Sequence, residues 1–333
     1  MDPIALTLDL IRIPSPTGQE GAVANHVADL LAGEGWQVTR QELGDGRRNV
    51  YAVLDPPVIV FSTHLDVVPP ELPVSEDAEW IHGRGSADAK GVAAAMIAAA
   101  TRLRDAGERR LGLLFLAGEE DGSDGARAAA ALQPKGRFLI NGEPTDNRLV
   151  IGHPGALRVR LHATGRAAHS AYVEKGRSAI HLLLDAIYRI RGRPLPSDSQ
   201  LGATTVNIGR IEGGVAANVL APTASADLLY RIVAPAEGIR TSIETAAGPS
   251  VEVSFPVEIP PFHSEPLPGW DCTTVRFTTD LPLLKEWGEG YLLGPGSIRV
   301  AHTDEERIAK ADLLAGVDAY VRLANQLLAR NAA

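Results

Sequence analysis

The chain has 333 residues, of which 45% are hydrophobic and 22% are charged, a composition typical of a folded globular protein with one or two domains. The formal net charge is −9 and no basic stripe is present, which argues against nucleic acid as the main partner. The single cysteine, Cys272, excludes both a disulfide within the chain and a cysteine-based zinc finger.

Neither a signal peptide nor a membrane span is visible in the sequence. The first residues, Met1 to Ile4, lack a basic segment followed by an apolar one. The longest apolar stretch, residues 91–100, is mostly alanine and is far shorter than a bilayer requires. We therefore expect a cytoplasmic protein that does not contact a membrane.

Helix and strand patterns alternate over the first 150 residues. Asp2 followed by Pro3 is typical of a helix start. Hydrophobic patterns and helix propensity predict further helices at 22–31, 88–103 and 126–132, and strands at 37–42, 49–54, 58–63, 111–117 and 137–141. This alternation predicts an α/β domain with a mostly parallel mixed sheet and helices on both faces.

The pattern changes after residue 153, where strands alternate between apolar and polar residues. Strands are expected at 156–162, 204–211, 224–233 and 251–255, with helices at 178–190 and 236–246. This β-α-β-β-α-β order is that of a ferredoxin-like α+β module. A closing helix is expected at 310–328. We expect residues 1–153 and 263–333 to form one domain and 154–262 to form a smaller domain inserted into it.

Three of the predicted buried strands end in acids or imidazoles. The strand at 58–63 leads to His64 and Asp66, the strand at 111–117 to Glu119 and Glu120, and the strand at 137–141 to Glu143. Adjacent buried carboxylates are costly unless a cation compensates them. We therefore expect one crevice at the carboxyl edge of the sheet, compensated by a divalent metal ion.

The individual residues leave alternatives open. His64 and Asp66 share one face of an extended segment, which suits a metal-binding imidazole oriented by a carboxylate, but this pair taken alone favours a structural histidine paired with an acid. Asp88 follows a glycine-rich segment, 83–87, at the expected start of a helix. It could be a metal ligand, the helix N-cap, or both.

Six ordered motifs together resemble one known family. They are Ser-Thr-His-Leu-Asp-Val-Val (62–68), Gly-Arg-Gly-Ser-Ala-Asp-Ala-Lys-Gly (83–91), Gly-Glu-Glu (118–120), Gly-Glu-Pro-Thr (142–145), Ala-His-Ser (168–170) and Gly-Pro-Gly-Ser-Ile-Arg-Val-Ala-His-Thr-Asp-Glu (294–305). This set resembles the dinuclear zinc amidohydrolase family that contains acetylornithine deacetylase, succinyl-diaminopimelate desuccinylase, aminoacylase and carboxypeptidase G. The resemblance covers residues 10 to 325.

The resemblance implies a role for each matched residue. One zinc ion would be bound by His64 and Glu143 and the other by Glu120 and His302, with Asp88 bridging the two. Glu119 would be the general base, and Asp66 would orient His64. Cobalt or manganese could replace zinc. Imidazoles and carboxylates suit zinc, and two metals can bind both the attacking and the developing oxygen.

The expected inserted domain contains further matches. His169 resembles a histidine that reaches across a dimer to the partner's active site, and this implies a homodimer formed through residues 154–262. Asn218 and Arg231 resemble substrate-facing residues, and a guanidinium can bind a carboxylate bidentately. The alternatives are that Asn218 is a turn residue and that Arg231 pairs with a neighbouring acid.

Some features depart from the family pattern or match no part of it. Residues 172–180 lack the proline common in the family, and the links at 69–80 and 263–290 are short. The remaining histidines are expected to be structural or solvated; they are His26, His82, His153, His162, His181 and His263. The segment 294–296 reads as a turn that positions His302 and not as a phosphate loop.

The resemblance implies a dizinc hydrolase that cleaves the amide bond of a small N-acyl amino acid. We expect acetylornithine, acetyl-lysine or a succinylated diamino acid as substrate, with a role in arginine or lysine biosynthesis. Within the family, the alternative is a dipeptidase or carboxypeptidase. Outside enzymes, the alternatives are a non-catalytic binding protein, which would lack Glu119 or a ligand, and a zinc-stabilised structural domain, which would favour closed tetrahedral sites.

Overall fold

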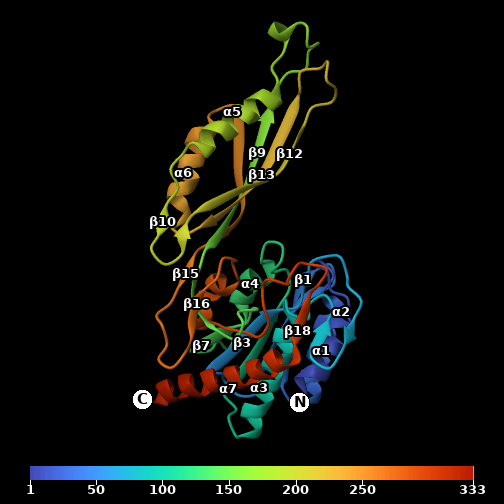
Figure 1. The fold of residues 1–333 in the computed structure, drawn as a ribbon, viewed down its shortest axis with the longest axis vertical. Helices are drawn as coiled ribbons and strands as arrows, with labels where there is room; N and C mark the ends of the chain where they lie inside the picture. The colour runs from blue at the N-terminus through green and yellow to red at the C-terminus, as the bar shows by residue number, and fades with distance from the viewer. Residues whose placement is uncertain (333) are drawn as a thin grey trace. The chain divides into compact units, whose positions relative to one another are not determined.

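The computed structural model describes residues 1–332 and divides the chain into two units. The first unit comprises residues 1–151, 264–273 and 279–333, and the second comprises 152–263 and 274–278. Figure 1 labels the helices and strands of both. Within the described residues, every helix is too short or too polar to span a membrane.

Among the described residues, the first unit contains five α-helices and two 3-10 helices, and its first helix is capped. Its helices are α1 (Pro3–Ile11), α2 (Gly21–Gly33), α3 (Lys90–Asp105), α4 (Asp124–Ala128) and α7 (Lys310–Ala332), with 3-10 helices η1 (Ala129–Ala131) and η3 (Leu281–Trp287). Asp2 caps α1 by accepting a hydrogen bond from the Ile4 N–H, as its position before Pro3 predicts.

The strands of the first unit form one large sheet and one small one. The large sheet has the order β1 (Gln37–Gly44), β2 (Arg47–Val53), β6 (Leu111–Leu116), β3 (Ile59–His64), β7 (Phe138–Asn141), β17 (Glu289–Leu292) and β8 (Leu149–His153). The small sheet joins β18 (Arg307–Ala309), β5 (Trp80–His82) and β4 (Ser75–Glu76). The neighbours β6, β3, β7 and β17 run parallel, so the mostly parallel mixed sheet is confirmed.

Both faces of the large sheet are covered, which explains its apolar strands. Every residue of β3 and β6 is buried, as expected for parallel strands with a layer on each side. On one face Phe61 meets Tyr320 of α7 edge to face, at 5.9 Å between ring centroids. On the other face Tyr51 meets Trp287 of η3 in the same manner, at 5.1 Å.

The second unit is an antiparallel sheet with two helices. Its main elements are β9 (Gly155–Thr164), α5 (Ala179–Arg191), β12 (Thr205–Gly213), β13 (Thr223–Ile232), α6 (Ala236–Ala247) and β14 (Val251–Ile259). The sheet order is β12-β13-β9-β14, so β12 and β14 are the edges. This is the ferredoxin-like arrangement that the β-α-β-β-α-β order predicts. Shorter elements are η2 (Val173–Lys175), β10 (Ser197–Asp198), β11 (Gly202–Ala203) and β15 (Phe262–His263), while β16 (Cys272–Thr274) pairs with β8.

Alternation along the strands builds the core of the second unit. Buried and exposed residues alternate along β9, so that Leu157, Val159 and Leu161 lie in the core while the residues between them reach solvent. α5 and α6 contact this sheet, and Ile187 of α5 belongs to the same apolar cluster.

Several predicted bounds differ from the structure. The helix expected at 88–103 begins at Lys90, with Ala89 at its N-cap, so Asp88 does not cap it. The helix expected at 126–132 is one short α-helix followed by a 3-10 turn. The short strands β4, β5, β8, β17 and β18 were not predicted, because segments of two to five residues carry too little pattern and pair through tertiary contacts.

The core of the second unit can be tested by one truncation. Leu161→Ala removes a fully buried side chain, and we expect it to lower the free energy of unfolding by about 2–5 kcal/mol. Leu314→Ala is the control, because Leu314 is half-exposed on α7 and its truncation should change stability by about 0.5 kcal/mol or less. Urea unfolding measures both, and equal losses would contradict this assignment of the core.

Candidate metal centre

Three parallel neighbours of the large sheet bring the predicted site residues together. β3 ends at His64, β6 is followed by Glu119 and Glu120, and β7 is followed by Glu143. Because β6, β3 and β7 are adjacent and parallel, their carboxyl ends lie at the same edge of the sheet. The polar ends of these strands therefore meet in space, although they are far apart in sequence.

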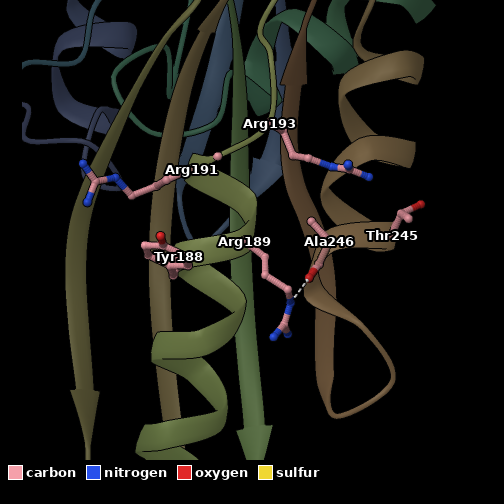
Figure 2. A pocket seen from close by; sticks show the side chains of 7 residues that line it. Tyr188, Arg189, Arg191, Arg193, Thr245 and Ala246 are labelled. Atoms are coloured by element: carbon pink, nitrogen blue, oxygen red, sulfur yellow. Dashed lines mark hydrogen bonds between the residues drawn. The ribbon is translucent and has the colours of Figure 1, made fainter.

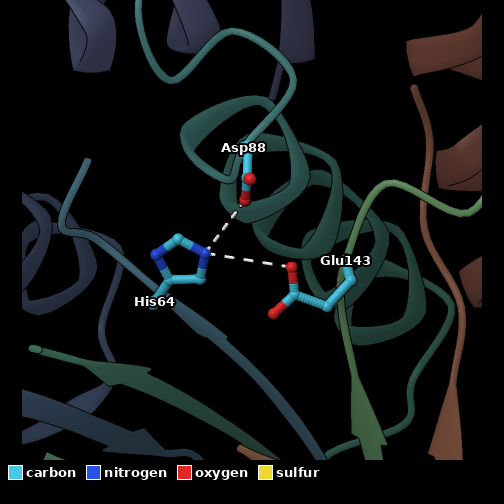
Figure 3. A group of neighbouring side chains, drawn as sticks. All are labelled: His64, Asp88 and Glu143. Carbon is cyan, nitrogen blue, oxygen red and sulfur yellow. Dashed lines mark hydrogen bonds and ion pairs between the residues drawn. The ribbon is translucent and has the colours of Figure 1, made fainter. Parts of the chain in front are cut away.

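A first group of potential ligands is completely buried. The nearest ligand atoms of His64, Asp88 and Glu143 all lie within 4.8 Å of one another. Nε2 of His64 lies 3.1 Å from an Asp88 carboxylate oxygen and 3.9 Å from a Glu143 oxygen. Figure 3 shows the three side chains converging from a strand, the start of a helix and the end of another strand.

A second group shares Asp88 with the first. The ligand atoms of Asp88, Glu120 and His302 also lie within 4.8 Å of one another. Nε2 of His302 lies 2.9 Å from Glu120 Oε1 and 3.4 Å from the second carboxylate oxygen of Asp88, Oδ2. Asp88 thus presents one oxygen to each imidazole, which is the geometry that a bridging carboxylate needs.

The Asp66 carboxylate accepts hydrogen bonds from the backbone that carries Glu119 and Glu120. Its two oxygens accept the backbone N–H groups of Glu119 and Glu120, each at 3.1 Å, and the Thr17 hydroxyl at 2.9 Å. Nδ1 of His64 lies 3.0 Å from the Asp66 backbone carbonyl and 3.4 Å from its carboxylate. Since a ligating imidazole commonly donates its other N–H in this way, Nε2 is the nitrogen left for a metal.

Gly118 makes the sharp turn that precedes the two glutamates. Its φ of +75° lies in the left-handed region, and a Cβ there would come within 2.1 Å of Asp124 and 2.5 Å of Arg47. Arg47 in turn binds both Asp124, at 2.6 Å, and the buried Glu20, at 2.9 Å. The turn that presents Glu119 and Glu120 is therefore enclosed by an ion-pair network.

The electrostatics of the two groups show an excess of buried negative charge. Burial raises the pKa of Glu119 well above its usual range, and the charge of Glu143 raises it further. Burial likewise raises the pKa values of Glu143 and Glu120. Hydrogen bonds to Asp88 and Glu120 raise the pKa of His302 to about 10. Carboxylates gathered in this way favour the binding of cations.

These donors fit divalent metal ions. The two groups combine imidazole nitrogens with carboxylate oxygens, which are ligands of zinc, cobalt and manganese. Within residues 1–332 they are also the clusters of histidine, cysteine and acidic residues whose spacing suits a metal. Ligation requires neutral imidazoles and ionised carboxylates, so metal binding at these groups would depend on pH.

Sequence reasoning did not identify two buried acids close to the centre. Asp280 is buried just before η3, where its charge contributes to the raised pKa values of Glu119 and Glu143. Glu306 is buried four residues after His302. Neither follows a strand or joins a spacing pattern, and no local signal in the sequence marks them as buried.

The predicted residues of the second unit lie in two places within it. His169 and Asn218 are both exposed and lie in adjoining loops, where His169 pairs with Val219 in a β-bridge and the Ser170 N–H donates to the Asn218 carbonyl at 2.9 Å. Arg231 lies near the end of β13 and donates to the Thr278 hydroxyl at 2.8 Å. The alternative of Asn218 as a loop residue fits its exposed position.

A cavity of about 640 Å³ lies between the C-terminal ends of α5 and α6, lined by Tyr188, Arg189, Arg191, Gly192, Arg193, Thr245 and Ala246. Arg189 is engaged in structure, because it donates to the Ala246 and Ala247 carbonyls at 2.7 and 2.9 Å. Figure 2 shows Arg191 and Arg193 pointing to opposite sides of the helix end. Since its cations diverge, we assign this cavity no role in binding an anion.

Among the remaining histidines, His153 is buried and stacks on Phe262 at 5.4 Å between ring centroids. Burial lowers its pKa to about 4, so it is a neutral structural side chain. His82 is partly exposed and pairs with Asp77 at 3.2 Å.

Comparison with known proteins identifies the family. The model of peptidase family M20/M25/M40 matches residues 60–326. A peptidase M20 domain-containing protein of Schizosaccharomyces pombe is 37% identical over 96% of this chain and 83% of its own length. A probable carboxypeptidase of Aspergillus flavus is 38% identical over 97% of this chain and 86% of its own length.

Solved structures show the same fold at lower identity. Aminopeptidase PepT from Bacillus cereus superposes with a TM-score of 0.76 at 21% identity, covering 98% of each chain. An M20 family metallo-carboxypeptidase from Sulfolobus solfataricus superposes with a TM-score of 0.76 at 16% identity, covering 96% of this chain and 98% of its own. With a family match over most of its length and two candidate metal-binding groups that share one aspartate, the chain belongs to peptidase family M20/M25/M40 and is a metallohydrolase.

Proposed function

We propose that this metallohydrolase is a two-metal carboxypeptidase that removes a C-terminal residue from small peptides. The observation that carries the proposal is the pair of ligand groups joined at Asp88, with Glu119 beside them. The choice of peptidase over deacylase is supported by the relatives, because those from several Aspergillus species are named probable carboxypeptidases. The expected roles in arginine and lysine biosynthesis have no such support.

We further propose that His64, Asp88 and Glu143 hold one zinc ion and that Asp88, Glu120 and His302 hold the other. Cobalt or manganese could occupy the same sites. Two divalent ions would polarise the scissile carbonyl and lower the pKa of a bound water. The chain's own contribution is to fix the ligands at the ends of rigid strands and to leave Glu119 outside both groups.

Glu119 is proposed as the general base. It adjoins Glu120 in sequence, but its carboxylate belongs to neither ligand group. Its backbone is held by Asp66, which limits how far the side chain can move. A carboxylate in this position can accept a proton from the attacking water and return it to the leaving amine.

The substrate's carboxylate is proposed to bind Arg231. The guanidinium is fastened to Thr278, whose hydroxyl donates to the Pro154 carbonyl at 3.0 Å. A fixed, partly buried guanidinium can recognise a C-terminal carboxylate bidentately. Asn218 is proposed to contact the substrate as well, on the strength of the motif alone.

A homodimer through the second unit is also proposed. β12 is an edge strand with one row of backbone groups free for pairing. Leu184 and Tyr188, four residues apart on α5, are 48% and 83% exposed, and Ile211 of β12 is 50% exposed. Large apolar side chains exposed on a helix and on an edge strand suit a self-complementary interface. His169 is proposed to act in the partner's active site.

The first prediction concerns Glu119. We expect purified protein to hold about two divalent ions per chain, and chelation to abolish activity until zinc or cobalt is restored. Glu119→Gln should retain both ions, because it removes no ligand, but should lower kcat by about 10²–10⁴-fold. Elemental analysis and peptide hydrolysis assays measure the two effects. Glu305→Gln, at an exposed position, serves as the control. Near-normal turnover by Glu119→Gln would remove Glu119 from the mechanism.

The second prediction concerns the substrate. Peptides with a free C-terminal carboxylate should be cleaved faster than their amides, by about 10–150-fold, since a charge-assisted contact is worth about 1.5–3 kcal/mol. Arg231→Met should reduce this preference without changing metal content. Faster cleavage of N-acetyl amino acids than of any dipeptide would favour the deacylase, and equal cleavage of acids and amides would argue against the role of Arg231.

The third prediction concerns the dimer. His169→Ala and Glu119→Gln should each be nearly inactive, but a mixture that has exchanged subunits should regain part of the activity. One of the two sites in a mixed dimer would contain an intact Glu119 together with an intact His169 from the other subunit. Absence of recovery, despite exchange shown by differently tagged chains, would contradict action across the dimer.

A further inference from the structure

The loop that leads to Asp88 is fastened by one buried carboxylate, that of Glu306. Glu306 Oε1 accepts the backbone N–H groups of Gly85, Ala87 and Asp88 at 2.9, 3.2 and 3.1 Å. Glu306 Oε2 accepts from Nη1 of Arg84 at 2.7 Å. The three hydrogen bonds from backbone N–H groups fix the path of the backbone that carries the shared carboxylate, that of Asp88.

This contact is enclosed in the protein. The side chain of Glu306 is fully buried, and that of Arg84 is 4% exposed. A buried charge is tolerated only with a partner and satisfied hydrogen bonds. Here the guanidinium supplies the charge and the three N–H groups supply the hydrogen bonds, so both carboxylate oxygens are satisfied.

The same contact reaches the segment that carries His302. Arg84 also donates to the Thr303 carbonyl at 3.1 Å, and the Gly83 N–H donates to the Glu306 carbonyl at 3.1 Å. His302 itself is half-exposed and has a φ of +61°, in the left-handed region that residues other than glycine rarely adopt. Its position therefore depends on its own segment being held, because solvent covers half of its side chain.

The other ligands are held by different means. His64 is the last residue of a fully buried central strand, and Glu143 follows β7 in the same sheet. The backbone of Glu120 is held by Asp66. Two of the three ligands in the group that contains His302, namely Asp88 and His302 itself, thus lie on segments held by Glu306, whereas in the other group only the shared Asp88 does.

We propose that Glu306 is a positioning residue that sets the affinity of the second metal site, formed by Asp88, Glu120 and His302, and affects the first site much less. The inference rests on the proposed two-metal centre. It adds that a residue with no ligand atom in either group determines how tightly one of the two ions is held. Contacts of this kind commonly change metal affinity by about 10–100-fold.

The experiment is a titration of the metal-free, full-length protein with Co²⁺. Calorimetry and the visible absorption of bound cobalt measure the binding at each step of the titration. The unmodified protein should bind two ions. Glu306→Gln keeps the shape of the side chain and one acceptor oxygen, but it places an amide against Arg84. We expect one of its two Co²⁺ ions to bind about 10–100-fold more weakly and the affinity for the other to change by about threefold or less.

The control is Glu108→Gln. The side chain of Glu108 is 19% exposed, accepts from Nη2 of Arg110 at 2.7 Å, and accepts the Arg110 N–H at 2.8 Å. Glu108 likewise joins a guanidinium to a backbone N–H, but it precedes the amino end of β6, whereas the candidate ligands lie at the carboxyl ends of the strands. We expect both Co²⁺ affinities of Glu108→Gln to stay within about threefold of the unmodified protein.

A second variant covers the case in which Glu306→Gln does not fold. Glu306→Asp keeps the charge for Arg84 but is one methylene shorter, so it cannot reach all three N–H groups. One of its two Co²⁺ ions should likewise bind more weakly than in the unmodified protein, while the affinity for the other changes little. The visible spectrum of the more weakly bound ion should also be altered.

The outcomes separate the inference from the function on which it rests. Equal weakening of both ions in Glu306→Gln, or the same selective loss in Glu108→Gln, would overturn the positioning role. Two unchanged Co²⁺ affinities in the Glu306 variants would do so as well. Fewer than two Co²⁺ ions bound by the unmodified protein would overturn the two-metal centre itself, and this inference with it.

Discussion

The structure of the first unit depends on one electrostatic constraint, the gathering of carboxylates at the ends of three parallel strands. Asp88, Glu119, Glu120 and Glu143 lie where the sheet excludes most of the water, so their mutual repulsion is weakly screened. Such an arrangement is stable only with cations or bound protons. The three strands, the Gly118 turn and the loop before α3 bring these carboxylates together. Because the chain belongs to a family of metallohydrolases, we expect the compensating cation to be a metal ion.

Around this centre, carboxylates without ligand atoms hold the backbone in place. Asp66 binds the N–H groups of Glu119 and Glu120, and Glu306 binds those of the loop before α3. Both use a buried carboxylate to accept several N–H groups at once, which fixes a turn more firmly than one hydrogen bond can. The proposed ligands Glu120 and Asp88 are therefore positioned through hydrogen bonds from their backbone N–H groups.

The sequence predicted the fold class because its signals were local and strong. Continuous apolar runs marked β3 and β6, and the regular alternation of the second unit marked β9 and β13. It did not predict the short strands or the true start of α3, where tertiary contacts override propensity. His64, Glu120 and Glu143 were found because acids and imidazoles at strand ends are conspicuous, whereas the proposed ligand roles of Asp88 and His302 came from the resemblance to the family. Glu306 was missed because its importance comes from contacts with residues more than 200 positions earlier in the chain.

Carboxypeptidase and deacylase activities differ less in this scaffold than their names suggest. Both cleave an amide whose amine side is an amino acid with a free carboxylate, so the metal centre, Glu119 and a carboxylate-binding Arg231 would serve either reaction. The distinction lies in what is accepted on the acyl side, an amino acid residue or a small acyl group. Because the metal ligands would serve either reaction, the motifs that contain them indicate the family without separating a deacylase from a carboxypeptidase. What supports the proposal of a carboxypeptidase is the naming of relatives such as the Aspergillus flavus protein, which is 38% identical over 97% of this chain.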